Sequence, residues 1–186
     1  FMGMGEPLLN YKNVIESIDQ ITSDFGIGIS YKKITLSTSG ISKMIKKMAD
    51  ENVKFNLAIS LHTALEKTRN KVMPFSKSFP ITELVDSLEY WYKKIKRKIT
   101  FEYLIWNEIN DDFEHINALV SICKRIPSKV NIIEYNDTHN SMFRNADEKW
   151  INNYVTTLKE NRIPVSIRRS RGKDIDAACG QLANKY

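Results

Sequence analysis

Residues 33–60, KITLSTSGISKMIKKMADENVKFNLAIS, decide the fold. The short segment 33–36 predicts a strand, and the largely apolar run from Phe55 to Leu61 is typical of a strand buried on both faces. Between them a helix is predicted over 39–51, because four apolar residues recur there at helical spacing: Ile41, Met44, Ile45 and Met48. Strand, helix and strand in this order favour a parallel sheet.

The same alternation continues to the end of the chain. Pro80 suits the first turn of a helix, and apolar residues follow it at helical spacing. Further strands are predicted at 99–106, 130–133 and 164–167, and further helices at 113–126 and 147–160. The sequence therefore predicts an α/β fold with mostly parallel strands, in an open sheet or a barrel, forming one domain over residues 1–186.

Composition narrows the functional classes. The 186 residues carry a net charge of +6, which favours a polyanionic partner such as nucleic acid. Two distant cysteines argue against a disulfide scaffold and fit the reducing cytoplasm. No apolar run is long enough to span a bilayer, so no membrane partner is expected. The chain opens at Phe1 as if inside a strand, and we expect an N-terminal portion to lie outside this sequence.

Small and polar residues follow several of the predicted strands. Ligand sites in parallel α/β folds gather at the carboxyl ends of the strands, so these segments are expected to converge. They are Gly3–Leu8, Ser37–Gly40, Ser60–His62 and Tyr135–Asn136.

Each of these polar residues also has a structural interpretation. Glu6 could bind an ammonium group or could start a helix together with Pro7. The hydroxyls of the 37–40 segment could bind a ligand, although Thr38 or Ser39 is more simply a helix N-cap. His62, after a buried strand, is by itself more typical of a structural histidine. Glu102, inside a predicted strand, must find a partner or face a cavity.

The two cysteines differ in their surroundings. Cys123 lies on the apolar stripe of its helix and is expected to pack in the core. Cys179 follows a basic segment and stands among Ala177, Ala178 and Gly180, where small neighbours let a bulky partner approach the sulfur. The three histidines show no metal-ligand spacing, so no zinc site is predicted.

Together and in this order, the motifs resemble the radical S-adenosylmethionine (radical SAM) adenine methyltransferases of the RlmN and Cfr type. The most specific match is the tail segment 174–182, DIDAACGQL. The other matching segments are 3–8, 36–40, 58–62, 101–103, 130–136 and the remainder of 168–182.

The resemblance implies a partial radical SAM (β/α) barrel whose N-terminal part lies outside this chain. Gly5 and Glu6 would contact the methionine part of S-adenosylmethionine, and Cys179 would be the catalytic, methyl-carrying cysteine. The ligands of a [4Fe-4S] cluster and a second catalytic cysteine would lie upstream, so no metal ligand is expected here. The rest of the S-adenosylmethionine site would come from Ser37, Ser60, Leu61, His62 and Asn136.

The implied activity is methylation of adenine C2 in 23S rRNA and tRNA, through a methylated Cys179 and with an external electron donor. The basic segment before the tail would lie near RNA phosphates. Methylation at adenine C8, the Cfr activity, uses the same motifs and stays open. A catalytically inactive RNA-binding module also stays open, and a C-x3-C-x2-C motif upstream would decide against it.

Overall fold

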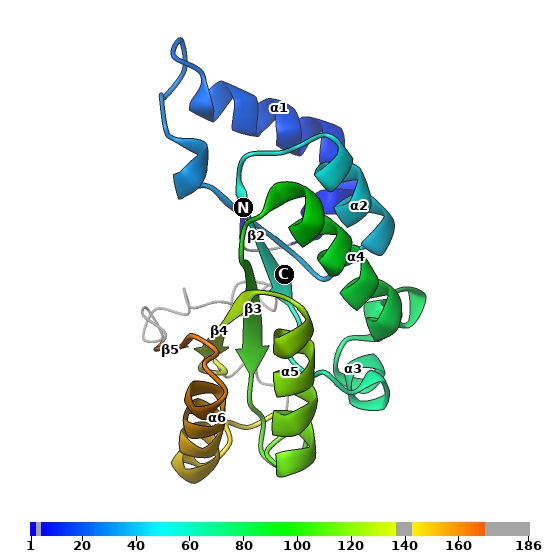
Figure 1. Cartoon of the computed structure of the whole chain (residues 1–186), viewed down its shortest axis with the longest axis vertical. Helices are drawn as coiled ribbons and strands as arrows, with labels where there is room; N and C mark the ends of the chain where they lie inside the picture. Colours follow the sequence, from blue (N-terminus) through cyan, green and yellow to red (C-terminus); the bar gives the residue numbers. More distant parts are fainter. Residues whose placement is uncertain (3–4, 137–142, 170–186) are drawn as a thin grey trace.

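The computed structural model describes residues 1–2, 5–136 and 143–169. Their five strands form one parallel sheet in the order β1-β2-β3-β4-β5 (Figure 1). Consecutive strands are neighbours in the sheet and run in the same direction. Each connection therefore returns the chain to the end of the sheet at which the next strand starts. The strands are β1 (Thr35–Thr38), β2 (Asn56–Ser60), β3 (Ile99–Leu104), β4 (Ser128–Ile133) and β5 (Val165–Arg168).

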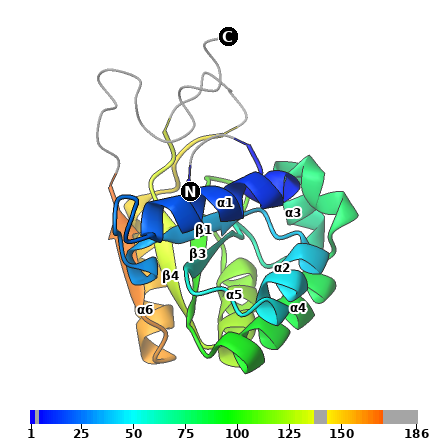
Figure 2. The ribbon, with the colours of Figure 1, turned by 90° about the horizontal axis from the view of Figure 1, so that it is seen from above.

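Six α-helices and three short 3-10 helices lie within the described residues. Figures 1 and 2 both show α2, α4 and α5 gathered on one side of the sheet, and α2 packs closely on α4. The helices are η1 (Pro7–Asn10), α1 (Tyr11–Thr22), η2 (Tyr31–Lys33), α2 (Ser42–Asp50), α3 (Glu66–Val72), η3 (Pro74–Ser78), α4 (Ile81–Ile95), α5 (Phe113–Arg125) and α6 (Glu148–Glu160).

The predicted parallel α/β architecture is confirmed, with small shifts at the ends of the elements. β1 begins at Thr35, because Tyr31–Lys33 forms the turn of η2. Helices α1 and α3 lie outside the predicted elements. Helix α1 carries apolar residues at helical spacing, of which Val14 and Ile18 are buried, whereas α3 buries only Arg69.

Both faces of the central strands are covered. Three consecutive residues of β2 are buried, and so are the first five residues of β3. This matches the expectation for continuous apolar runs in a parallel sheet. On the outer face, apolar side chains of α4 such as Leu84, Leu88 and Trp91 are completely buried. Cys123 is also buried, as predicted for a core cysteine.

Four polar residues lie in register on the neighbouring strands β2, β3, β4 and β5. Ser60, Glu102, Asn131 and Ser166 are successive partners on β2, β3, β4 and β5. Asn131 donates to Glu102 Oε1 at 2.9 Å and accepts from Ser166 Oγ at 2.7 Å. Arg168 reaches Glu102 Oε2 at 3.6 Å. The strand carboxylate has therefore found partners, as its position requires.

The outer edge of β1 pairs with the first residue of the chain. The Phe1 amino group donates to the Thr35 carbonyl at 2.7 Å, and Ser37 N–H donates to the Phe1 carbonyl at 3.1 Å. These are the bonds that a residue of a neighbouring parallel strand makes. Within the described ranges, no helix combines the length and the apolar character that a membrane span requires.

Candidate functional site

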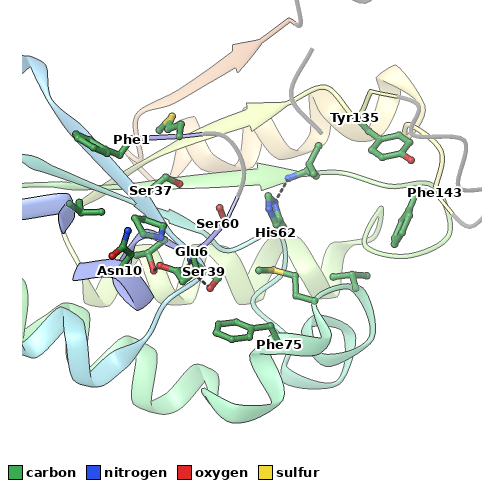
Figure 3. Close-up of a pocket in the computed structure, with 18 of the residues that line it drawn as sticks. Phe1, Glu6, Asn10, Ser37, Ser39, Ser60, His62, Phe75, Tyr135 and Phe143 are labelled. Atoms are coloured by element: carbon green, nitrogen blue, oxygen red, sulfur yellow. Dashed lines mark hydrogen bonds between the residues drawn. The ribbon is translucent and has the colours of Figure 1, made fainter. Parts of the chain in front are cut away.

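A cavity of about 860 Å³ lies at the carboxyl ends of the strands. Its volume falls in the range of roughly 300–1,000 Å³ that small-ligand sites usually have. Four of the predicted polar segments contribute to its wall, which extends to α3 and η3 (Figure 3). Apart from the aromatic residues described below, the polar residues and the glycine that line it are Gly5, Glu6, Asn10, Ser37, Thr38, Ser39, Ser60 and His62.

Glu6 joins the chain segments at one end of the cavity through hydrogen bonds. Its Oε1 accepts from Leu8 N–H at 3.0 Å and from the Thr38 hydroxyl at 2.7 Å. Its Oε2 accepts from the N–H and the hydroxyl of Ser39, at 2.7 and 2.6 Å. A carboxylate has about four acceptor positions, so these four donors engage its full capacity. Glu6 is also the N-cap of η1, with Pro7 in the first turn, which fits the helix-start interpretation.

The hydroxyls of Thr38 and Ser39 donate to the Glu6 carboxylate and do not cap the next helix. The prediction that Thr38 or Ser39 caps that helix is wrong, because α2 begins only at Ser42 and its N-cap, Ile41, makes no side-chain capping bond. Thr38 instead accepts from Gly40 N–H at 3.0 Å while donating to Glu6. The segment is thus folded around Glu6.

His62 enters the cavity from the turn after β2. Its backbone has φ +57°, a left-handed conformation that is uncommon for a non-glycine residue. Its Nδ1 accepts from the backbone N–H of Leu104 at 3.3 Å. Burial, aided by the Arg69 cation, lowers the pKa of His62 to about 4. The imidazole is therefore neutral near pH 7, with its proton on Nε2.

Aromatic rings line the opposite end of the cavity. Figure 3 shows Tyr135 and Phe143 there, away from Glu6 and Ser39. Trp106, just after β3, lies 5.1 Å from the Phe143 ring and 6.5 Å from the Tyr135 ring, measured between centroids. It also meets His62 edge-to-face at 5.7 Å. The cavity thus has a hydroxyl- and acid-rich end and an aromatic end.

The remaining predicted site residues are placed differently. The side chains of Leu61 and Asn136 are buried and are not among the described residues that line the cavity. Gly5 lines it with φ +83°, a conformation that glycine adopts readily. Cys179 lies outside the described residues. Among the described residues, no group of three His, Cys, Asp or Glu side chains could hold a metal ion.

Several important residues gave no usable sequence signal. The aromatic residues Trp106 and Phe143 give no sign of a site in the sequence, because single aromatic residues in loops are common. Arg69, fully buried in α3, sits in the stretch Glu66-Lys67-Thr68-Arg69-Asn70-Lys71, which has the composition of an exposed helical turn. Only the packing of α3 behind the β1 loop distinguishes Arg69 from its neighbours.

The fold resembles that of one class of enzymes. The chain superposes with a TM-score of 0.93 and 32% identity on a radical SAM methyltransferase from Sphaerobacter thermophilus, over 97% of this chain and 53% of that one. It matches a domain of a pyruvate-formate lyase-activating enzyme from Bacteroides vulgatus with a TM-score of 0.69 over 90% of this chain and 96% of that domain; at 14% identity this shows the fold alone. The architecture is that of the radical SAM methyltransferases.

Sequence relatives make the assignment more specific. The chain is 61% identical to a probable dual-specificity RNA methyltransferase RlmN of Flavobacterium psychrophilum and 54% identical to that of Christiangramia forsetii, in both cases over the whole of this chain. The resemblance inferred from the motifs is confirmed, and the chain is homologous throughout to the RlmN-type radical SAM methyltransferases. It spans about half the length of these curated relatives, 53% in both cases. No family model matches.

Proposed function

We propose that this chain forms the S-adenosylmethionine-binding portion of a radical SAM RNA methyltransferase. One observation carries the proposal: Gly5, Glu6, Ser37, Ser60 and His62, drawn from separate motifs, line a single cavity at the carboxyl ends of parallel strands. That is where ligands bind in such folds. The homology to RlmN enzymes supplies the chemistry expected of the cavity.

The shape and lining of the cavity fit S-adenosylmethionine. The negative charge of Glu6 at one end suits the amino group of the methionine part, and the Ser37 and Ser60 hydroxyls that also line the cavity can donate to its carboxylate. The aromatic end of the cavity, around Trp106 and Phe143, suits the face of the adenine ring. The neutral His62 would offer an Nε2–H donor between the two ends. When bound, the cofactor would supply the methyl group and the radical.

The described residues do not fit an iron–sulfur cluster. Such clusters are held by cysteine thiolates, and the described ranges contain only Cys123, which is buried in the core. The resemblance would put the [4Fe-4S] ligands of the whole protein upstream of this chain, and we derive no step from the cluster.

The proposed reaction is methylation of adenine C2 in 23S rRNA and tRNA, in the cytoplasm, with an external electron donor. Its substrate class comes from the relatives, which are called dual-specificity RNA methyltransferases. The RlmN name of these relatives favours C2 over C8. Cys179 would carry the methyl group, as the match of segment 174–182 implies.

The proposal is tested first by binding. Calorimetry should show that this chain binds S-adenosylmethionine, and Glu6→Ala should weaken binding by about 1.5–3 kcal/mol through loss of charge-assisted contacts and of the loop they hold. Glu16→Ala, on the exposed face of α1, is the matched control and should leave the affinity unchanged. No binding by the unaltered chain would contradict the proposed function.

The second test concerns the chemistry and uses the whole, cluster-loaded protein. The peptide containing Cys179 should gain the mass of one methyl group, and Cys179→Ala should abolish RNA methylation. Retained turnover in that variant would show that Cys179 is not the methyl carrier.

A further inference from the structure

Arg69 is a buried cation that the proposed site does not use. It lies in α3 with no exposed surface. Its Nη2 donates to the Ser39 carbonyl at 2.5 Å and its Nη1 reaches the Phe79 carbonyl at 3.5 Å, while Nε has no hydrogen-bond partner. None of the described carboxylates forms an ion pair with it. Burial lowers its pKa, but arginine starts so high that the guanidinium stays charged.

A continuous chain of hydrogen bonds leads from this cation to Glu6. Arg69 donates to the Ser39 carbonyl, whose peptide group ends in the N–H of Gly40. That N–H donates to the Thr38 hydroxyl at 3.0 Å, and the hydroxyl donates to Glu6 Oε1 at 2.7 Å. Every donor points in the same direction, from the positive end to the negative end.

Such an alignment strengthens each link. Hydrogen bonds in series polarise one another, and a low-dielectric interior increases the effect. A buried charge also needs compensation, and the carboxylate of Glu66, one turn earlier on α3, acts on the guanidinium electrostatically. The chain of bonds therefore links Arg69 to Glu6 through one peptide group and one hydroxyl, while Glu66 supplies the nearby negative charge.

We propose that Arg69 is a positioning residue of the cofactor cavity, which through Ser39, Gly40 and Thr38 holds the β1 loop and the Glu6 carboxylate in the geometry that receives the amino-acid end of S-adenosylmethionine. Arg69 itself does not line the cavity, so its action is indirect. The proposal rests on the proposed function for the identity of the ligand. The hydrogen bonds from Arg69 to Glu6 do not depend on which ligand the cavity receives.

The structure shows why an arginine serves here. Its planar fork reaches carbonyls of two separate segments, one after β1 and one before α4. It thereby ties the loop after β1 to the connection between α3 and α4. Gly40 allows the loop to close against α4, since its φ of +107° and its approach to Leu84 disfavour a side chain.

The first experiment needs no ligand. Amide hydrogen exchange at Ser39 and Gly40 should be at least about tenfold faster in Arg69→Met and in Thr38→Val, because each interrupts the chain of hydrogen bonds at a different link. Arg125→Met, which removes an exposed arginine paired with Asp86 and Glu89, is the control and should leave both amides protected. Thr38→Val is nearly isosteric, so it tests the proposal even if Arg69→Met folds poorly. Exchange unchanged in both variants would overturn the proposal.

The second experiment separates positioning from general stability. Each single variant should raise the Kd for S-adenosylhomocysteine by at least about tenfold but leave the Kd for adenosine unchanged, since adenosine lacks the amino-acid end. The double variant should bind about as weakly as either single variant, because both break one chain of bonds. Equal losses for both compounds, or additive losses, would contradict the proposal. If the unaltered chain binds neither compound, the proposed function fails, while the exchange result still decides whether Arg69 holds the loop.

Discussion

Leu104 donates its backbone N–H to Nδ1 of His62 across 3.3 Å. A backbone donor at this nitrogen requires it to be unprotonated, so the ring is neutral and carries its proton on Nε2. The bond also joins the turn after β2 to the end of β3, at the point where the strand enters the cavity wall. His62 is therefore fixed in orientation and in tautomer before any ligand arrives.

This relationship predicts an acid-sensitive stability. The pKa of His62 is about 4 in the folded chain, against an ordinary value of 6.5. Between these values the unfolded chain binds the proton more readily, so stability falls as the pH is lowered from about 6.5 towards 4. At 1.36 kcal/mol per pKa unit, the loss amounts to at most about 3 kcal/mol.

Urea unfolding at pH 7 and pH 4.5 measures the effect. His62→Gln cannot titrate, so its stability should fall less over this interval than that of the unaltered chain. All other titrating groups are common to both proteins and cancel in the comparison. Parallel losses in the two proteins would show that His62 is not held neutral, and an NMR titration of its ring would locate the pKa directly.

The sequence was sufficient to predict the fold because its signals are local and repeated. The largely apolar run at 55–61 marks a strand buried on both faces, the segment 99–106 marks a further strand, and helical spacing marks α2, α4 and α5. Helix α1 was predictable from the helical spacing of Val14, Ile18 and Ile21, whereas α3 buries only Arg69 and is stabilised by packing rather than by an apolar stripe. Tertiary contact of this kind leaves little trace in a single sequence.

The candidate site was predictable only in part. The strand ends bring Gly5, Ser37 and Ser60 together, as the parallel topology requires. The partners of each side chain could not be inferred, because they depend on backbone geometry between distant segments. Thus Glu6 is engaged by hydroxyls that looked like helix caps, and the cation behind them, Arg69, looked like a surface residue.

Glu102 is predicted to stabilise the sheet through Asn131. Glu102→Ala would leave the half-buried Asn131 Nδ2 without its acceptor and should lower the free energy of unfolding by about 1–3 kcal/mol. Glu102→Gln keeps an acceptor oxygen and should cost less. Glu16→Ala is the control, since its pairing with Lys12 is exposed and worth under about 1 kcal/mol. Chemical denaturation checks the order, and an equal effect at Glu16 and Glu102 would contradict it.

Gly40 is predicted to accept a side chain only at a cost in stability. Its φ is +107°, and an added Cβ would lie 2.8 Å from Leu84 Cδ1 in the fully buried face of α4. Gly28 has φ +69° but open space around it, so Gly28→Ala measures backbone strain alone, on the order of 1–2 kcal/mol. Gly40→Ala should cost about 1–3 kcal/mol more because of overpacking. Thermal or urea unfolding of the two variants tests this, and equal losses would show that Leu84 moves aside freely.

The thiol of Cys123 is predicted to be unreactive in the folded chain. Burial raises the pKa of its thiol to about 11, from an ordinary 9.0, so its thiolate population at pH 8 is roughly a hundredfold lower than in the unfolded chain. Alkylation by iodoacetamide, followed by peptide mass spectrometry, should therefore be at least about a hundredfold slower at Cys123 in the native chain than in denaturant. Cys123→Ala should reduce stability by about 1 kcal/mol, as a small core truncation does, and should leave RNA methylation by the whole protein intact. Rapid native labelling of Cys123, or loss of methylation in its alanine variant, would assign this cysteine a chemical role that its buried position in α5 does not support.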